Sequence, residues 1–139
     1  MQAPQILATQ LPELENEKGL TLTVLIPCYN ELATIEPVLE RVESVNLADE
    51  IIIIDDGSTD GTRDILKRIE AEQRPGVRII YHAKNQGKGA ALVTGFQAAT
   101  SDILLIQDAD FEYDPREYPI LLKPMYEGIS SVVYGSRFL

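Results

Sequence analysis

Residues 50–61 read EIIIIDDGSTDG, and this stretch decides the fold class. Its four consecutive isoleucines are β-branched and apolar, which is typical of a strand buried on both faces, as in a parallel sheet. The DDGSTDG that follows is rich in turn-forming residues. Ile65, Leu66 and Ile69 come next at helical spacing. The stretch therefore predicts a buried strand, a turn and a helix.

The same alternation extends to both sides of this stretch. The apolar run at 22–27 predicts a strand, and apolar residues at 35, 38, 39 and 42 form the stripe of an amphipathic helix. Further strands are expected at 77–81, 103–106 and 131–134, and further helices at 88–99 and after Asp114. Strands that alternate with helices make a largely parallel sheet, so the predicted class is α/β.

The last expected helix has clear end signals. Asp114 is a typical N-cap, Pro115 suits the first helical position, and Gly128 can end the helix in a left-handed turn. Its inner face is predicted to carry Tyr118, Leu121, Leu122 and Met125.

Composition narrows the classes of partner. The chain has 139 residues, 45% of them hydrophobic, and its 22 acidic against 12 basic residues give a net charge of −10. That excess of acid disfavours a protein that coats nucleic acid or is held electrostatically on anionic lipid. The acids serve solubility, or some of them gather around a cation.

Other features bear on location and domain organisation. Cys28 is the only cysteine, so a disulfide within the chain is excluded and a reducing compartment is favoured. No signal peptide is recognisable, and no apolar run approaches the roughly 18 residues of a membrane span. We expect a cytoplasmic protein, at most peripheral at the cytoplasmic face of a membrane. Residues 1–20 are predicted to be a flexible leader, and 21–139 one domain, the N-terminal part of a longer fold.

Ligands of open parallel sheets bind beyond the carboxyl ends of the strands. Four segments follow predicted strands there: 27–31, 55–58, 107–110 and 134–137. Polar and unusual residues are concentrated in these segments, so one rim of the sheet is the predicted site.

Asp108 and Asp110 form a D-x-D pair after a predicted strand. Such a pair can give oxygen ligands to Mg²⁺ or Mn²⁺ shared with a nucleotide diphosphate. A solvated acidic turn is the alternative, which the position after an apolar strand disfavours. A calcium loop that begins at Asp108 is excluded, because Tyr113 stands at its glycine position and Pro119 at its final glutamate position.

Two further segments of the rim have open readings. Asp55 and Asp56 can accept hydrogen bonds from a base or a ribose, whereas capping of the next helix explains only the residues at 58–60. Tyr29 can stack on a base with Glu31 nearby, or be a partly buried tyrosine before the first helical turn. Spacing alone does not decide between these readings.

The loop NQGKG at 85–89 is not a phosphate-binding P-loop, because His82 stands where its first glycine is needed and Gly89 where a Ser or Thr is needed. Its backbone N–H groups and Lys88 can still meet an anion at the start of the helix. Arg137 is the other cation on the predicted rim, where it suits a diphosphate; an ordinary surface arginine is the alternative, which the sequence leaves open. His82, the only histidine, is expected to be a surface residue at a strand end.

Taken together, LTVLIPCYNE, EIIIIDDGSTDGT, NQGKGAAL, LLIQDADFEYDP and VVYGSRF, in this order, resemble the family 2 glycosyltransferases. The resemblance covers about residues 22–138 and is strongest to the branch with dolichyl-phosphate mannosyltransferase and bacterial polyprenyl-phosphate glycosyltransferases. It implies the GT-A fold, a Rossmann-like nucleotide-binding sandwich.

The resemblance also implies roles for single residues. Asp108 and Asp110 would be catalytic and hold Mg²⁺ or Mn²⁺ on the diphosphate of an NDP-sugar donor, GDP- or UDP-linked. Arg137 matches the arginine of the G-[ST]-R motif and would contact the donor phosphates, and Lys88 matches a more variable position. The other implied nucleotide-sugar contacts are Pro27, Tyr29, Glu31, Ile54, Asp56 and Ala109.

The implied reaction is inverting transfer of a hexose to an acceptor, with a polyprenyl phosphate favoured. A polyprenyl phosphate is already an anion, so it attacks without the carboxylate base that a sugar hydroxyl needs. The segment that binds the acceptor is expected to be missing, so the chain alone is expected to turn over poorly. The alternatives are a non-catalytic nucleotide-sugar-binding module and a phospho-acceptor receiver domain, for which Lys123 comes too early.

Overall fold

The computed structural model describes residues 14–110 and 114–128. The chain divides into two compact units, each taken here by itself. The sheet unit is Thr21–Tyr113, and the α4 unit combines Met1–Leu20 with Asp114–Leu139. The expected strand at 131–134 and Arg137 lie outside the described residues.

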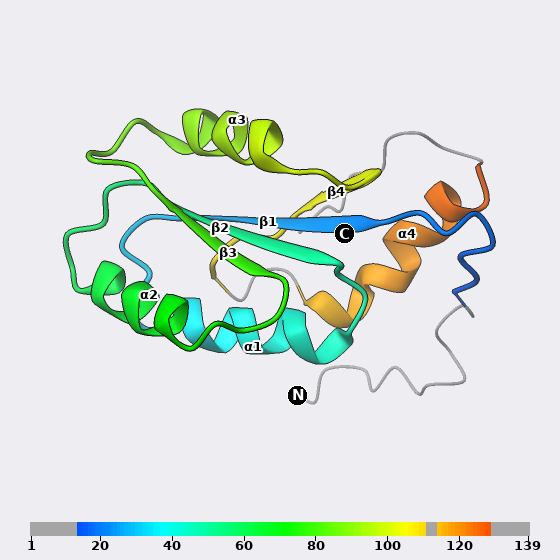
Figure 1. The fold of residues 1–139 in the computed structure, drawn as a ribbon, viewed down its shortest axis with the longest axis horizontal. Coiled ribbons are helices and arrows are strands. Elements are labelled where there is room, and N and C mark those ends of the chain that lie inside the picture. Colours follow the sequence, from blue (N-terminus) through cyan, green and yellow to red (C-terminus); the bar gives the residue numbers. More distant parts are fainter. Residues whose placement is uncertain (1–13, 111–113, 129–139) are drawn as a thin grey trace, which may run out of the picture. The chain divides into compact units, whose positions relative to one another are not determined.

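The sheet unit is built on a four-stranded, all-parallel sheet (Figure 1). Its strands are β1 (Leu22–Cys28), β2 (Glu50–Asp55), β3 (Val77–Tyr81) and β4 (Ile103–Ile106), in the spatial order β3-β2-β1-β4. The chain builds outward from β1 to β3 and then returns to the other side of β1. The carboxyl end of β1 is therefore a topological switch point, where open α/β sheets bind ligands.

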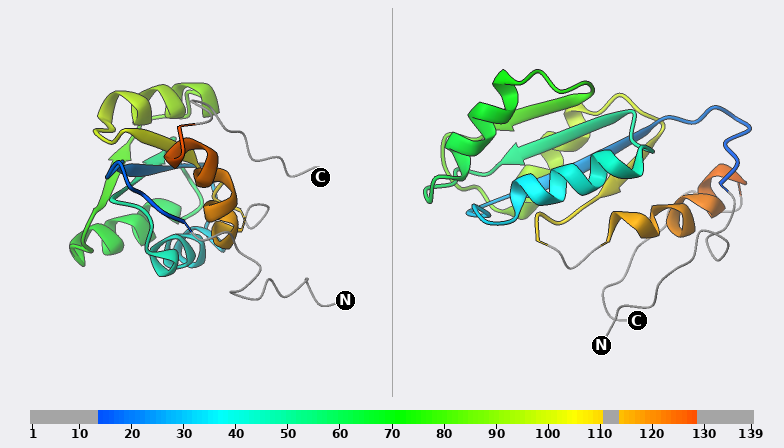
Figure 2. Two further views of the ribbon diagram at one scale, coloured as in Figure 1. Left: turned by 90° about the vertical axis from the view of Figure 1, so that its right-hand side faces the viewer. Right: turned by 90° about the horizontal axis from the view of Figure 1, so that it is seen from below.

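Helices cover both faces of this sheet. The helices α1 (Ile35–Val45) and α2 (Thr62–Ala71) lie on one face, and α3 (Lys88–Ala98) lies on the other (Figures 1 and 2). All four apolar positions of the predicted α1 stripe are buried, and so are the four isoleucines of β2. These burial patterns confirm the amphipathic helix and the two-faced strand.

Helix α3 packs through small residues. Ala91 and Gly95 are its buried positions, whereas Phe96 is 45% exposed. A Cβ added at Gly95 would lie 3.0 Å from Cδ1 of Ile54 and 3.1 Å from Cδ1 of Leu25. The larger side chains of Leu92 and Phe96 thus do not form the buried face, because the backbone of α3 lies too close to the sheet for them.

In the α4 unit, a 3₁₀ turn (Pro115–Glu117) leads into α4 (Tyr118–Tyr126). The Asp114 carboxylate accepts the Arg116 N–H at 3.0 Å, as predicted for an N-cap, and Gly128 has the predicted positive φ of 74°. The expected inner face needs correction, since Tyr126 is buried while Leu121 and Met125 are only half-buried. In residues 14–110 and 114–128, no helix combines the length and apolarity that a bilayer crossing requires.

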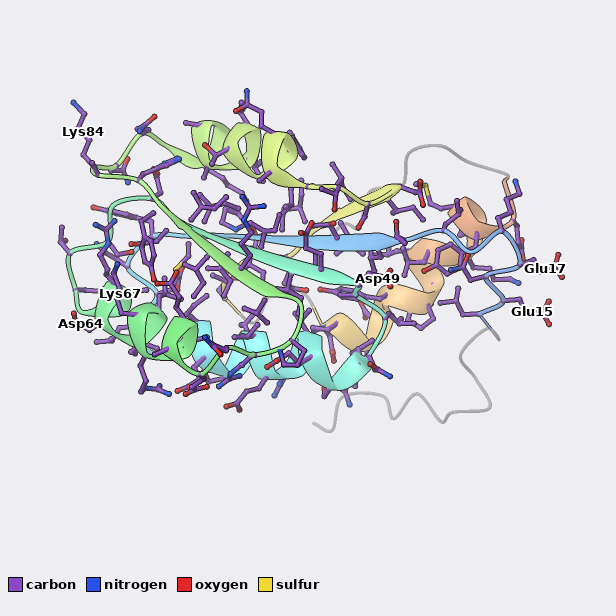
Figure 3. The ribbon with its side chains drawn as sticks, viewed as in Figure 1. Glu15, Glu17, Asp49, Asp64, Lys67 and Lys84 are labelled. Atoms are coloured by element: carbon purple, nitrogen blue, oxygen red, sulfur yellow. The ribbon has the colours of Figure 1, made fainter. Side chains whose placement is uncertain are left out.

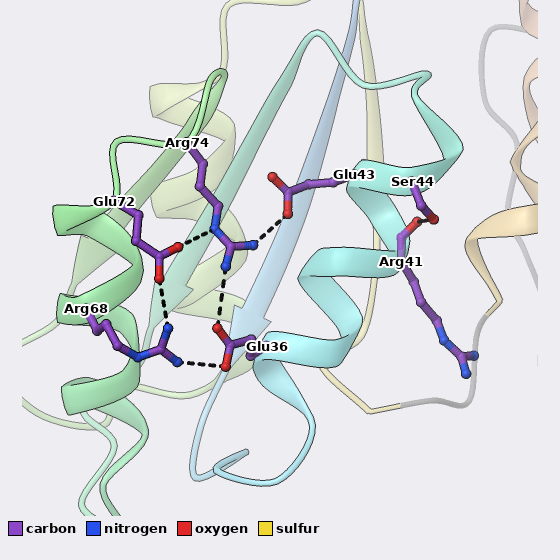
Figure 4. Close-up of polar contacts among 7 residues, drawn as sticks. All are labelled: Glu36, Arg41, Glu43, Ser44, Arg68, Glu72 and Arg74. Atoms are coloured by element: carbon purple, nitrogen blue, oxygen red, sulfur yellow. Dashed lines mark hydrogen bonds and ion pairs between the residues drawn. The ribbon is translucent and has the colours of Figure 1, made fainter.

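The outer surfaces of α1, α2 and the turn after α2 carry a set of charges that we call the α1–α2 ion-pair network (Figure 4). Arg74 contacts Glu43 at 2.8 Å, Glu72 at 2.7 Å and Glu36 at 3.4 Å. Arg68 joins Glu36 at 2.7 Å and Glu72 at 2.8 Å. The network ties the two helices of one face together, at the surface and away from the carboxyl ends of the strands.

Candidate functional site

The loops after β1, β2 and β3 lie together at one end of the sheet, on the left in Figure 1. Backbone hydrogen bonds extend the sheet pairing into them, from Asp56 N–H to the Cys28 carbonyl and from His82 N–H to the Asp55 carbonyl, both at 2.8 Å. The residue after β4 is anchored likewise, by Gln107 N–H to the Leu25 carbonyl at 2.8 Å. The strand ends thus form one connected rim, as the sequence predicts.

Asn30 joins the loops after β1 and β2. It adopts a left-handed conformation, with φ of 52°. Its N–H donates to Oγ of Ser58 at 2.9 Å, and its side-chain Oδ1 accepts the Thr59 N–H at 2.8 Å. This arrangement leaves the neighbouring Tyr29 44% exposed on the rim. Asn30 is not among the site residues identified from the sequence. Its one clue in the sequence is that asparagine tolerates positive φ better than most residues.

Thr34 joins the loop after β1 to the D-x-D pair. Its hydroxyl lies 2.6 Å from the carbonyl oxygen of Ala109, between the two aspartates, and 3.0 Å from Oε2 of Glu31. Since both partners are acceptors of hydrogen bonds, the single hydroxyl proton serves the shorter contact. Glu31 and Ala109, both candidates from the sequence, are thereby brought to the same place, through a residue that the sequence did not single out.

Asp55 has an internal partner. Its carboxylate is fully buried, and Oδ2 accepts from Nε of Arg63 at 2.8 Å. The same guanidinium donates through Nη2 to the His82 carbonyl at 2.5 Å. Asp60, rather than Asp55, serves the start of α2, where it accepts the Thr62 N–H at 3.0 Å. Asp55 therefore fixes the ends of β2 and β3 to α2.

Asp56 is the centre of a second buried set of contacts. Its Oδ1 accepts the Gln86 N–H and lies beside Nδ1 of His82, both at 2.9 Å, and its Oδ2 accepts the Gly87 N–H at 2.8 Å. Nε2 of the same histidine lies 2.8 Å from the Thr94 hydroxyl. Burial raises the pKa of Asp56, but the hydrogen bonds from His82, Gln86 and Gly87 outweigh this and leave the pKa below its ordinary value.

These contacts correct two expectations. His82 is 8% exposed, so it is not a surface residue; its ring is held between a carboxylate and a hydroxyl on α3. The N–H groups of Gln86 and Gly87, expected to face an external anion, face Asp56 instead. Neither the burial of His82 nor the internal partner of these N–H groups could be read from the sequence, because Asp56 lies far from the loop along the chain.

Lys88 and the D-x-D pair form the charged part of the rim. Nζ of Lys88 lies 2.6 Å from Oδ1 of Asp108, and the two side chains are 55% and 26% exposed. In the part of the chain that the structure describes, no three His, Cys, Asp or Glu side chains gather into a complete metal site. Two carboxylates still fit Mg²⁺ or Mn²⁺, because such ions complete their shells with water and substrate phosphates.

The remaining candidates are placed by the sheet itself. Pro27 and Ile54 are register partners near the ends of β1 and β2. Ile54 is fully buried in a core cluster with Leu25, Ile52 and Ala91, so only its main chain is available to a ligand at the rim.

Known relatives match this sequence over most of its length. Dolichol-phosphate mannosyltransferase of Pyrococcus furiosus is 31% identical over 122 residues, which cover 86% of this chain and 34% of that protein. Undecaprenyl-phosphate 4-deoxy-4-formamido-L-arabinose transferase of Edwardsiella ictaluri is 34% identical over 117 residues, 80% of this chain and 35% of that protein. The chain thus spans about a third of the length of these relatives.

Solved structures show the same fold. Mannosyltransferase PcManGT of Pyrobaculum calidifontis, in complex with GDP-Man and Mn²⁺, matches with a TM-score of 0.63 at 29% identity, over 70% of this chain and 30% of that one. Glucosyl-3-phosphoglycerate synthase of Mycobacterium tuberculosis, with Mn²⁺, UDP-glucose and phosphoglyceric acid, matches with a TM-score of 0.66 at 32% identity, over 81% and 42%. The expected α/β fold of the GT-A type is confirmed.

The family itself follows from the sequence as a whole. The model of glycosyl transferase family 2 matches residues 23–139, which include every motif of the rim. The chain therefore belongs to glycosyl transferase family 2.

Proposed function

We propose that this chain carries the donor-binding part of an inverting glycosyltransferase that moves a hexose from an NDP-sugar, GDP- or UDP-linked, to a polyprenyl phosphate. The observation that carries the proposal is the pairing of Lys88 with Asp108 at 2.6 Å on the strand-end rim. It puts a cation and a carboxylate of the D-x-D pair side by side, where a diphosphate and its metal need both signs of charge.

Asp108 and Asp110 are the residues proposed to hold Mg²⁺ or Mn²⁺. Their carboxylate oxygens are hard ligands, and the donor diphosphate would complete the coordination. When bound, the ion acts as a Lewis acid that stabilises the charge on the departing nucleoside diphosphate. Lys88 and Arg137 are proposed to neutralise the remaining phosphate charge.

The nucleoside is proposed to lie at the switch point. Tyr29 offers an exposed ring for stacking on the base. Pro27, Glu31 and Ala109 are proposed to line the nucleoside and its ribose. The main chain of Ile54 would complete this part of the site, whereas Asp56 is buried and both its carboxylate oxygens accept hydrogen bonds within the protein, so we give it a supporting role and no contact with the nucleoside.

The acceptor needs no general base. One oxygen of the polyprenyl phosphate bonds to the anomeric carbon while the bond from that carbon to the nucleoside diphosphate breaks, and the diphosphate leaves with the electron pair. The attacking phosphate is already anionic, so no proton has to be removed. Since the acceptor is a lipid, we place the reaction at the cytoplasmic face of a membrane, with the chain associating peripherally.

Calorimetry of the purified chain with GDP-, UDP- and dTDP-sugars tests this proposal. We expect one nucleotide to bind, about tenfold or more tightly with Mn²⁺ than without it. Asp110→Ala should abolish the response to Mn²⁺, whereas Asp64→Ala, an exposed aspartate on α2, should leave it unchanged. If donor binding and its response to Mn²⁺ survive Asp110→Ala, the assignment of the metal site is wrong.

A non-catalytic nucleotide-sugar-binding module is the alternative that the sequence motifs leave open. Such a module would bind donor and Mn²⁺ yet show neither hydrolysis nor transfer, even with the relatives' downstream segment restored. The receiver domain is set aside. In the sheet of a receiver domain the first and third strands are neighbours, whereas β1 here lies between β2 and β4.

A further inference from the structure

The loop of residues 83–87, between β3 and α3, lies directly on the turn after β2. A Cβ added at Gly57 would be 2.4 Å from the backbone nitrogen of Asn85 and 2.5 Å from the carbonyl carbon of Lys84. Gly57 also has a φ of 75°, so both backbone conformation and space require glycine there. Figure 3 shows Lys84 at the outer end of this loop, pointing away from the sheet.

Asp56 holds the end of this loop. Its two carboxylate oxygens accept the N–H groups of Gln86 and Gly87, at 2.9 and 2.8 Å. Hydrogen bonds to a buried charged acceptor are stronger than neutral ones and direct the donor groups closely. The backbone immediately before Lys88 is therefore fixed by the side chain of the residue that follows β2.

His82 and Thr94 in turn fix Asp56. A carboxylate only accepts, so Nδ1 of His82 carries the proton that points at Asp56. In the neutral ring, Nε2 then accepts from the hydroxyl of Thr94 on α3. The chain of contacts runs from α3 through the histidine to the aspartate and back to the loop that opens α3.

Lys88 is the first residue of α3, directly after Gly87, and its ammonium lies 2.6 Å from Asp108. We propose that His82 and Thr94 are positioning residues: through Asp56 they hold the loop at 83–87 and so place Lys88 beside Asp108, where it meets the diphosphate of the donor. This inference rests on the proposed function, because Lys88 has this task only if a nucleoside diphosphate binds at the rim. His82 is 8% exposed and acts only through Asp56.

Hydrogen exchange of the ligand-free chain tests the first half of the proposal. Thr94→Val keeps the shape of the side chain and removes the hydroxyl, so the N–H groups of Gln86 and Gly87 should exchange about tenfold faster. Thr94→Ser retains the hydroxyl and should restore slow exchange. Thr100→Val, after the end of α3, is the matched control outside the network. Unchanged exchange in Thr94→Val would show that the Thr94 hydroxyl does not help Asp56 to hold the loop.

His82 variants extend this test. His82→Asn retains an N–H donor for Asp56 and should keep the two N–H groups protected better than His82→Leu, which has none. Because the leucine variant can lose stability overall, exchange at β1 amides serves as the reference. Equal loss of protection in both variants, with β1 unchanged, would contradict the role of the histidine proton.

Calorimetry in the presence of Mn²⁺ tests the second half. Thr94→Val should weaken binding of UDP or GDP about three- to tenfold and leave UMP or GMP unchanged, because the monophosphates lack the second phosphate. In a Lys88→Met background, Thr94→Val should have no further effect on diphosphate binding, since both changes remove the same contact. A general structural role would instead weaken mono- and diphosphates alike.

The outcomes separate the two proposals. If the wild-type chain binds a diphosphate and Thr94→Val binds it equally well, the positioning role is wrong and the proposed function stands. If the wild-type chain binds neither diphosphate, the proposed function fails and the positioning role fails with it. In either case, hydrogen exchange shows whether His82 and Thr94 hold the loop at 83–87 through Asp56.

Discussion

Two clusters of charge in the sheet unit differ in what surrounds them. In the α1–α2 ion-pair network, carboxylates meet arginines at the surface, with side chains 19–51% exposed. At Asp56 the carboxylate side chain is 4% exposed and meets a histidine and two backbone N–H groups. Water competes for the first cluster and not for the second, so only the second holds its partners firmly.

The pKa values of the two clusters reflect this difference. At Glu36, the hydrogen bond from Arg68 is the main influence and lowers the pKa of the carboxyl. At Asp56, burial is the main influence and raises the pKa, yet the hydrogen bonds still bring it below its ordinary value. A carboxylate that remains ionised against burial must be matched closely by its donors.

Asp56→Ala is expected to have the largest effect on stability. It leaves the N–H groups of Gln86 and Gly87 and the ring of His82 buried without their acceptor, which costs about 3 kcal/mol of the free energy of unfolding. Urea unfolding followed by circular dichroism measures the change. A loss no larger than that of Asp64→Ala, an exposed aspartate on α2, would show that the buried contacts contribute little.

Acid should reveal the same contacts with a smaller effect. Because the folded pKa of Asp56 lies below its unfolded value, its stabilisation is complete above the unfolded pKa and is lost as the pH falls through the folded pKa. The difference in unfolding free energy between wild type and Asp56→Asn should therefore narrow as the pH is lowered from neutral through about 4, the ordinary pKa of an aspartate, and below it. Glu36 and Glu72, whose pKa values are also lowered, are common to both proteins and cancel. A constant difference across this range would refute the assignment.

The smallest effects are expected in the α1–α2 ion-pair network. Arg74→Ala removes contacts with three glutamates and should cost about 0.5–1 kcal/mol at low ionic strength. Much of this loss should vanish at 1 M NaCl, where the Debye length is about 3 Å. Arg68→Ala should change stability less, since its side chain is 51% exposed. If Arg74→Ala costs the same free energy of unfolding at both salt concentrations, the ion pairs of this network are as shielded from solvent as the contacts of Asp56.

Much of the sheet could be predicted because its signals are local. The strand at Val77–Tyr81 and the start of α3 at Lys88 have the bounds that the sequence predicts, and β1 and β2 differ only at their ends. The inner faces of α3 and α4 were harder. Whether Phe96 or Gly95 faces the sheet depends on how closely two backbones approach, which helical spacing alone does not contain.

The candidate site divides in the same way. Asp108 and Lys88 could be named from motifs, and the structure brings them together. The sequence did not reveal the structural roles of His82, Thr34 and Asn30. Each of them contacts a partner that lies between 26 and 75 residues away along the chain. A side chain that completes a contact across two loops carries no local pattern.

The sequence by itself determined the alternation of strands and helices, the rim on which the polar residues gather and the family of the chain, since these follow from hydrophobic spacing and contiguous motifs. Only the tertiary structure decided which acids face inward. Asp55 and Asp56 are adjacent in sequence, but one meets Arg63 and the other the loop that precedes Lys88. Successive residues at a strand end point to opposite faces of the sheet. The partners that each side chain finds there depend on how distant segments of the chain pack.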